Sequence, residues 1–135
     1  CKAKVQAGTE AVELDFRFDA RAKQAFEAAS DFIEDAMEQS SSVVYIHCAG
    51  GVSRSASIVL AFLMLKRRLR LRDAWVLVKD RRDVIAPNAG FFNVLCDMES
   101  SLYGSETMYR PASIHARDYR AKEDKVTALV AVTPP

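Results

Sequence analysis

The sequence predicts an α/β domain with a central, parallel-type sheet flanked by helices. Apolar residues recur with a helical period in four segments, two short segments have the composition of strands, and the strands alternate with helices. Strands separated by helices pair in parallel, and a parallel sheet needs further strands with both faces covered. Because no other strand is evident after Cys48, we expect the missing N-terminal strands upstream of Cys1, so that the chain is the C-terminal part of the domain.

The individual elements rest on local pattern and composition. AVELDF alternates apolar and polar side chains as a short strand does, and Asp19 can cap the helix that follows. Three serines at 40–42 end that helix, and VVYIH is β-branched and aromatic, which is typical of a buried strand. Trp75 is expected to be a core residue of a later helix. The expected elements cover, in chain order, residues 11–16, 20–39, 43–47, 54–68, 73–82 and 88–102.

The composition is that of a globular domain. Of 135 residues, 50% are hydrophobic and 27% are charged, with a formal net charge of +1. A charge so near neutral gives no general reason to expect nucleic acid or a membrane surface as a partner. The longest apolar run, 56–65, is too short to span a bilayer. Helical periodicity fades after Gly104, so we expect a domain over 1–104 and a poorly ordered polar tail over 105–135.

The three cysteines, Cys1, Cys48 and Cys96, lie far apart and lack the spacing of metal ligands. This pattern argues against a disulfide framework or a zinc site and favours reduced thiols in a cytoplasmic or nuclear protein. Cys96 is expected to be a packed residue of the last helix, and Cys1 is a weaker candidate as a redox partner of Cys48. His115, in the polar tail, is expected to be exposed.

The segment VVYIHCAGGVSRSAS places a cysteine between a strand and a loop with two glycines that leads into a helix. Backbone N–H groups at a helix N-terminus form an anion site, and glycine lets the backbone approach an anion closely. Arg54 offers a planar fork that can bind two phosphate oxygens. The same positive potential lowers a thiol pKa from about 8.5, so that Cys48 can attack phosphorus as a thiolate.

The remaining loop residues take supporting roles in this interpretation. Ser55 can donate a hydrogen bond to the leaving sulfur when water hydrolyses the cysteinyl-phosphate. A cysteine with two glycines would by itself indicate only a tight turn with a buried, inert thiol. The residues expected to bind phosphate are Ala49, Gly50, Gly51, Val52, Ser53 and Arg54.

The string HCAGGVSRS resembles the signature of the cysteine-dependent protein phosphatases, in which His-Cys, five residues and Arg form the phosphate loop. RDVIAPNAGF resembles the Pro-Asn-x-Gly-Phe segment of the dual-specificity phosphatases, and the resemblance covers about residues 24–104. It implies hydrolysis of phosphotyrosine and phosphoserine/threonine without metal or cofactor. The partner would be a phosphorylated protein, with a protein kinase among the candidates, and no oligomeric state is predicted. Asn88 and His47 would support the phosphate loop.

In this family an aspartate, usually a little over thirty residues before the cysteine, protonates the leaving group. The position ten residues before Phe26 is Phe16, which has no proton to donate. Asp15 lies one residue earlier and Asp19 three residues later. Asp15 is favoured, while Asp19, or the lack of an acid, stays open.

Other interpretations also stay open. The misaligned acid and the missing strands motivate a phosphate-binding pseudophosphatase or interaction module. A phosphoinositide or RNA phosphatase is disfavoured because 49–53 holds no lysine or arginine, and a rhodanese-like sulfur carrier is disfavoured by His47, Ser55 and the segment 87–91. The basic run KRRLRLR at 66–72 is expected to be a solvated helix end, with a docking patch or a nuclear-import signal as alternatives.

Overall fold

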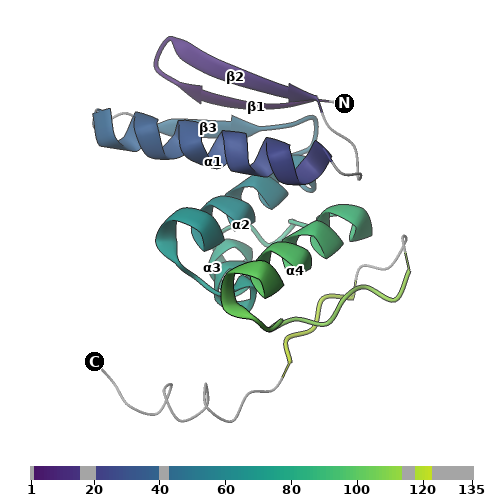
Figure 1. The fold of residues 1–135 in the computed structure, drawn as a ribbon. Helices are drawn as coiled ribbons and strands as arrows, with labels where there is room; N and C mark the ends of the chain where they lie inside the picture. Colours follow the sequence, from purple (N-terminus) through teal and green to yellow (C-terminus); the bar gives the residue numbers. More distant parts are fainter. Residues whose placement is uncertain (1, 16–20, 40–42, 114–117, 123–135) are drawn as a thin grey trace.

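The computed structural model describes residues 2–15, 21–39, 43–113 and 118–122 (Figure 1). The α/β class is confirmed, and each of the six expected segments is found with bounds within two residues of those expected. A further strand, β1, precedes them. The elements are β1 (Lys2–Ala7), β2 (Glu10–Asp15), α1 (Arg21–Gln39), β3 (Val44–His47), α2 (Arg54–Arg67), α3 (Leu71–Arg81) and α4 (Ala89–Tyr103).

The described strands form a sheet in the order β2-β1-β3, and both pairings are antiparallel. The expected parallel pairing is therefore not found between the described strands. The cause is β1, in which Lys2–Ala7 alternates side chains and buries Ala3 and Val5 completely. Gly8, at φ +59°, allows the tight turn into β2, and so short a connection can join only antiparallel strands. Since each is antiparallel to β1, β2 and β3 point the same way.

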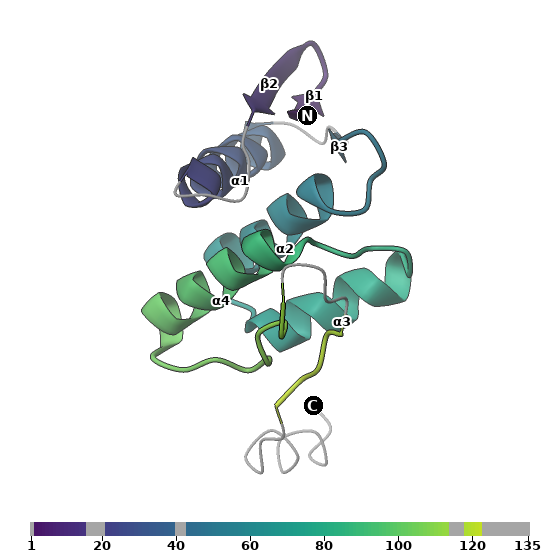
Figure 2. The same cartoon turned by 90° about the vertical axis from the view of Figure 1, so that its right-hand side faces the viewer.

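Helix α2 lies at the centre of the molecule. It is apolar on nearly all sides, which is typical of a buried helix, and it contacts each of the other helices and strands β1 and β3. The sheet lies at one end of the domain and α3 and α4 lie toward the other, as Figures 1 and 2 show. None of the helices in the described ranges is long and apolar enough to cross a membrane.

The chain continues to pack beyond α4, which ends at Gly104 with φ +79°. Met108 is fully buried and forms an isolated bridge with Ala121. The Tyr119 ring lies 4.4 Å from the ring of Trp75, and its hydroxyl donates to the Pro87 carbonyl. The structure thus packs 105–113 and 118–122 against the domain, where the sequence predicts a poorly ordered tail. The rest of that tail, with His115, lies outside the described residues.

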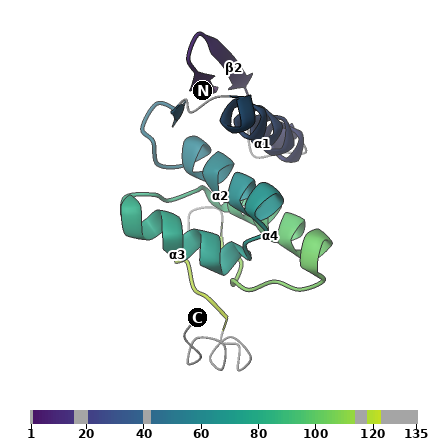
Figure 3. The ribbon, with the colours of Figure 1, turned by 90° about the vertical axis from the view of Figure 1, so that its left-hand side faces the viewer.

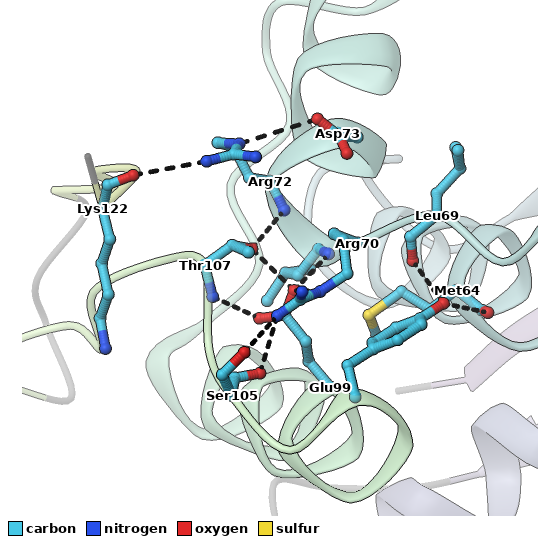
Figure 4. A network of polar contacts seen from close by, with 11 residues as sticks. Met64, Leu69, Arg70, Arg72, Asp73, Glu99, Ser105, Thr107 and Lys122 are labelled. Atoms are coloured by element: carbon cyan, nitrogen blue, oxygen red, sulfur yellow. Dashed lines mark hydrogen bonds and ion pairs between the residues drawn. The ribbon is translucent and has the colours of Figure 1, made fainter. Parts of the chain in front are cut away.

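A buried carboxylate fixes this C-terminal segment (Figure 4). Glu99 of α4 is completely buried, and its oxygens accept hydrogen bonds at 2.7 Å from the N–H groups of Leu71 and Thr107 and from the Thr107 hydroxyl. The Arg70 Nε lies 3.2 Å from the same carboxylate. Several donors and a cation offset the cost of removing this charge from water. Glu99 therefore joins α3, α4 and the segment after them.

The basic run 66–72 is largely neutralised within the chain. Four of its five cations lie within 4.0 Å of a carboxylate, which favours the solvated helix end over a docking patch. The pairs are Lys66–Asp31, Arg67–Glu34, Arg70–Glu99 and Arg72–Asp73.

Candidate active site

The loop from Cys48 to Ser53 leaves the end of β3 and enters α2, at one side of the molecule in both Figure 2 and Figure 3. A cavity of about 390 Å³ opens beside this loop. It brings together the predicted residues Cys48, Gly50, Gly51, Ser55 and His47. The full lining consists of Tyr45, Ile46, His47, Cys48, Gly50, Gly51, Ser55, Ala56, Val59, Val78, Arg82 and Ile85.

The environment of Cys48 favours the thiolate. Partial burial alone would raise the pKa of the Cys48 thiol. Hydrogen bonds from the Ser55 hydroxyl and from the N–H groups of Ser55, Gly51 and Gly50 outweigh burial and lower this pKa to about 7. The Cys48 Sγ lies 3.3 Å from the Ser55 Oγ. At pH 7, about half of such thiols are ionised, against about 1% at the ordinary value of 9.0.

Gly51 is required by the geometry of the loop. Its φ is +63°, in the left-handed region that favours glycine. A Cβ at this position would also lie 2.9 Å from the Nη2 of Arg82. A side chain at residue 51 would therefore strain the backbone and displace the Arg82 guanidinium.

The segment after α3 supports the loop through backbone hydrogen bonds. The Ala86 N–H donates to the Val52 carbonyl at 2.8 Å, and the Asn88 N–H donates to the Ser53 hydroxyl at 2.9 Å. The Asn88 side chain instead caps α4, accepting the Phe91 N–H at 2.9 Å. Asn88 thus supports the loop through its backbone, while its side chain begins the helix.

Arg82 is a cavity residue that the sequence interpretation did not single out. It follows α3, and its guanidinium reaches the loop, where Nε lies 2.9 Å from the Gly51 oxygen and Nη2 lies 3.4 Å from the Gly50 oxygen. The signal was its place at the start of RDVIAPNAGF, the segment that supports the loop.

Arg54 begins α2, as expected, and its guanidinium carbon lies 5.9 Å from the Phe91 ring centroid. Among the described residues, the cavity lining includes neither Arg54 nor the predicted loop residues Ala49, Val52 and Ser53. Phosphate binding by the Arg54 fork remains a prediction.

The favoured general acid, Asp15, belongs to the described residues. Asp15 is exposed at the end of β2, and β2 and β3 end at the same edge of the sheet because both are antiparallel to β1. Because β1 lies between β2 and β3, the backbones of these two strands are about 10 Å apart, or two strand spacings. No carboxylate of the described residues lines the cavity. Asp19 lies outside the described residues.

The remaining predicted residues are placed as follows. The His47 ring stacks on the exposed Tyr45 ring, with centroids 4.9 Å apart. Cys96 is completely buried, which confirms it as a packed residue, and burial raises the pKa of its thiol to about 12. Trp75 is confirmed as a core residue, and Cys1 lies outside the described residues. Within the described ranges, no three His, Cys, Asp or Glu side chains are grouped to hold a metal ion.

One wall of the cavity is apolar, and the sequence interpretation did not identify it. Its side chains come from β3, α2, α3 and the segment that follows: Ile46, Val59, Val78 and Ile85. Anion-binding amides thus lie beside a surface that suits the hydrocarbon part of a ligand.

Comparisons with known proteins agree with this geometry. A family model described as "Dual specificity phosphatase, catalytic domain" matches residues 4–101. Dual specificity protein phosphatase 26 of Bos taurus is 49% identical over 77 residues, which cover 57% of this chain and 36% of that protein. Dual specificity protein phosphatase 4 of Homo sapiens is 41% identical over 88 residues, which cover 65% of this chain and 22% of that protein.

A similar solved structure is a crystal structure of human DUSP28 with one substitution. It matches with a TM-score of 0.53 and 28% identity, covering 67% of this chain and 62% of that chain. The matched part of this chain spans about a third or less of the length of the two curated relatives.

Proposed function

Because the chain belongs to the dual specificity phosphatase family, we propose that it hydrolyses phosphotyrosine and phosphoserine/threonine in proteins through a cysteinyl-phosphate on Cys48. The observation that carries this proposal is the convergence of the Ser55 hydroxyl and three backbone N–H groups on the Cys48 sulfur. These donors supply thiolate at neutral pH, and in the family such a thiolate is the nucleophile.

In the first step, the Cys48 thiolate attacks phosphorus, the S–P bond forms and the ester P–O bond breaks. The loop N–H groups of 49–54 and the Arg54 guanidinium stabilise charge on the three equatorial oxygens. The leaving oxygen takes a proton from the general acid, for which we retain Asp15, with Asp19 as the alternative.

In the second step, water attacks the cysteinyl-phosphate and the S–P bond breaks, which releases inorganic phosphate and the thiolate. The ionised aspartate accepts a proton from the water. The Ser55 hydroxyl, 3.3 Å from the sulfur, donates a hydrogen bond to the departing thiolate. Ser55 therefore acts both on ionisation of the thiol and on its release.

The lining of the cavity supports this substrate class. Its apolar wall suits the ring of a phosphotyrosine, and the exposed side chain of Tyr45 offers a further contact beside it. We propose a phosphorylated protein, with protein kinases among the candidates, as the partner. The proposed compartment is the cytoplasm or nucleus, where thiols stay reduced.

The test is hydrolysis of a small aryl phosphate by the wild type, Cys48→Ser and Cys96→Ala. The wild type and Cys96→Ala should turn over the ester, whereas Cys48→Ser should lose at least about 10³-fold in rate. Rapid acid quenching followed by mass spectrometry should find a phosphate adduct on the Cys48 peptide.

A second candidate is a phosphate-binding pseudophosphatase, which is favoured by the lack of a carboxylate among the described residues that line the cavity. If the wild type is no faster than Cys48→Ser while both bind phosphate, the pseudophosphatase replaces the enzyme.

A further inference from the structure

Arg82 lines the same cavity as Cys48 and binds the backbone of the loop through its side chain. Its backbone N–H ends α3 by donating to the Val78 carbonyl at 2.9 Å, so the residue is anchored in the helix. Its guanidinium binds two consecutive carbonyl oxygens, those of Gly50 and Gly51, at 3.4 and 2.9 Å. A planar fork suits two adjacent acceptors, which a point-charge ammonium cannot engage in the same way.

These two contacts fix the direction of the N–H groups in the loop. The Gly50 carbonyl and the Gly51 N–H belong to one planar trans peptide unit, in which the two groups point in opposite directions. Arg82 binds the Gly50 oxygen at one end of this unit, and the Gly51 N–H at the other end donates to the Cys48 sulfur. The Gly51 carbonyl and the Val52 N–H form the next unit and follow the same rule.

We propose that Arg82 is a positioning residue: by holding the Gly50 and Gly51 oxygens turned away from the Cys48 sulfur, it aims the loop N–H groups at that sulfur and at a bound phosphate. The fit with Gly51 supports this role, because a Cβ there would occupy the place of the guanidinium, at 2.9 Å from Nη2. The neighbouring supports at Val52 and Ser53 come from the backbone N–H groups of Ala86 and Asn88. Arg82 instead acts through its side chain, which mutation can remove.

The charged and titratable groups around Cys48 come from several elements. Tyr45 and His47 of β3 and Arg82, which follows α3, line the cavity with Cys48, whereas Arg54, the first residue of α2, is not part of this lining. Loss of Arg82 therefore removes a cation as well as two hydrogen bonds. The experiment has to separate the effect of charge from the effect of geometry.

The test is the pH dependence of alkylation of Cys48 by iodoacetamide, followed on the Cys48 peptide by mass spectrometry. Arg82→Ala should move the midpoint upward by about one pH unit. Arg82→Lys keeps the charge but loses the fork, and it should show at least half of that shift. Arg81→Ala is the matched control, because Arg81 carries the same charge, is exposed, and makes its polar contacts with the Leu77 carbonyl and the Asp80 carboxylate.

Three results would overturn the proposal: a wild-type midpoint in Arg82→Ala, a wild-type midpoint in Arg82→Lys, or an equal shift in Arg81→Ala. Thermal unfolding of each variant shows whether it is folded under the conditions of alkylation. If Arg82→Ala is unfolded, Arg82→Gln takes its place with the same expected shift and the same contradicting result.

The consequence for turnover rests on the proposed function, but the alkylation result does not. At a pH below the shifted alkylation midpoint, less of the Cys48 thiol is ionised in Arg82→Ala than in the wild type. The kcat of this variant for an aryl phosphate should therefore fall, with a smaller change in KM. If the proposed function fails, the wild type does not hydrolyse the ester, yet the midpoints still differ. If the role of Arg82 fails, the wild type hydrolyses the ester and the midpoints coincide.

Discussion

At the scale of single residues, the behaviour of Cys48 depends on groups that are close in sequence. Gly50, Gly51 and Ser55 lie within seven residues of the thiol, and all donate to its sulfur through backbone N–H groups. These contacts could be predicted from the sequence because a short loop between a strand and a helix keeps its N–H groups close to the cysteine at its start. Arg82 could not be predicted in the same way, since its position depends on where α3 ends.

The general acid is the residue-scale question that mutation settles most directly. Asp15→Asn should abolish the limb of the pH–rate profile on which the rate falls with rising pH. On that limb the general acid loses the proton that it gives to the leaving oxygen. Asp19→Asn should leave that limb in place. The measurement is kcat against pH on an aryl phosphate with a poor leaving group.

Two outcomes would contradict the assignment of Asp15. Loss of the limb in Asp19→Asn alone transfers the role to Asp19. An unchanged profile in both variants removes both carboxylates from the mechanism.

At the scale of elements, the helices could be predicted well because each carries a periodic apolar face, as in Phe26 and Ile33 of α1. Strand β1 was missed because its buried side chains, Ala3 and Val5, are small and lie among lysines. Its absence from the prediction led to the wrong pairing, since β1 takes the place beside β3 where a parallel neighbour was expected.

Glu99 provides a prediction at this scale, because it joins α3 and α4 to the segment after them. Glu99→Ala should lower the free energy of unfolding by about 3 kcal/mol or more, since it leaves buried N–H groups and the Arg70 cation without their acceptor. Glu27→Ala, which removes an exposed partner of Lys23, should cost less than about 1 kcal/mol. Denaturant unfolding measures both values.

The role of Glu99 would be contradicted if the two variants were equally stable. Glu99→Gln is a second test, because it keeps the shape of the side chain and loses the charge. Its free energy of unfolding should lie between those of the wild type and Glu99→Ala.

At the scale of the whole molecule, the reactive loop is held between the sheet and the helical layer. Cys48 follows β3, Ser55 belongs to α2, and the segment after α3 supports the loop through hydrogen bonds such as that from the Ala86 N–H to the Val52 carbonyl. The packed segment after Gly104 contacts this support in turn, because the Tyr119 ring packs against Trp75 of α3 and the Tyr119 hydroxyl donates to the Pro87 carbonyl. Sequence periodicity could not predict it, since its few apolar residues find their partners far along the chain.

This arrangement keeps about half of the Cys48 thiols ionised at pH 7. The most direct measurement is the rate of alkylation of Cys48 by iodoacetamide as a function of pH in the wild type, since only the thiolate reacts. The rate should rise with pH through a midpoint of about 7, where the hydrogen bonds place the pKa of this thiol. A midpoint near the ordinary value of 9.0 would contradict the account.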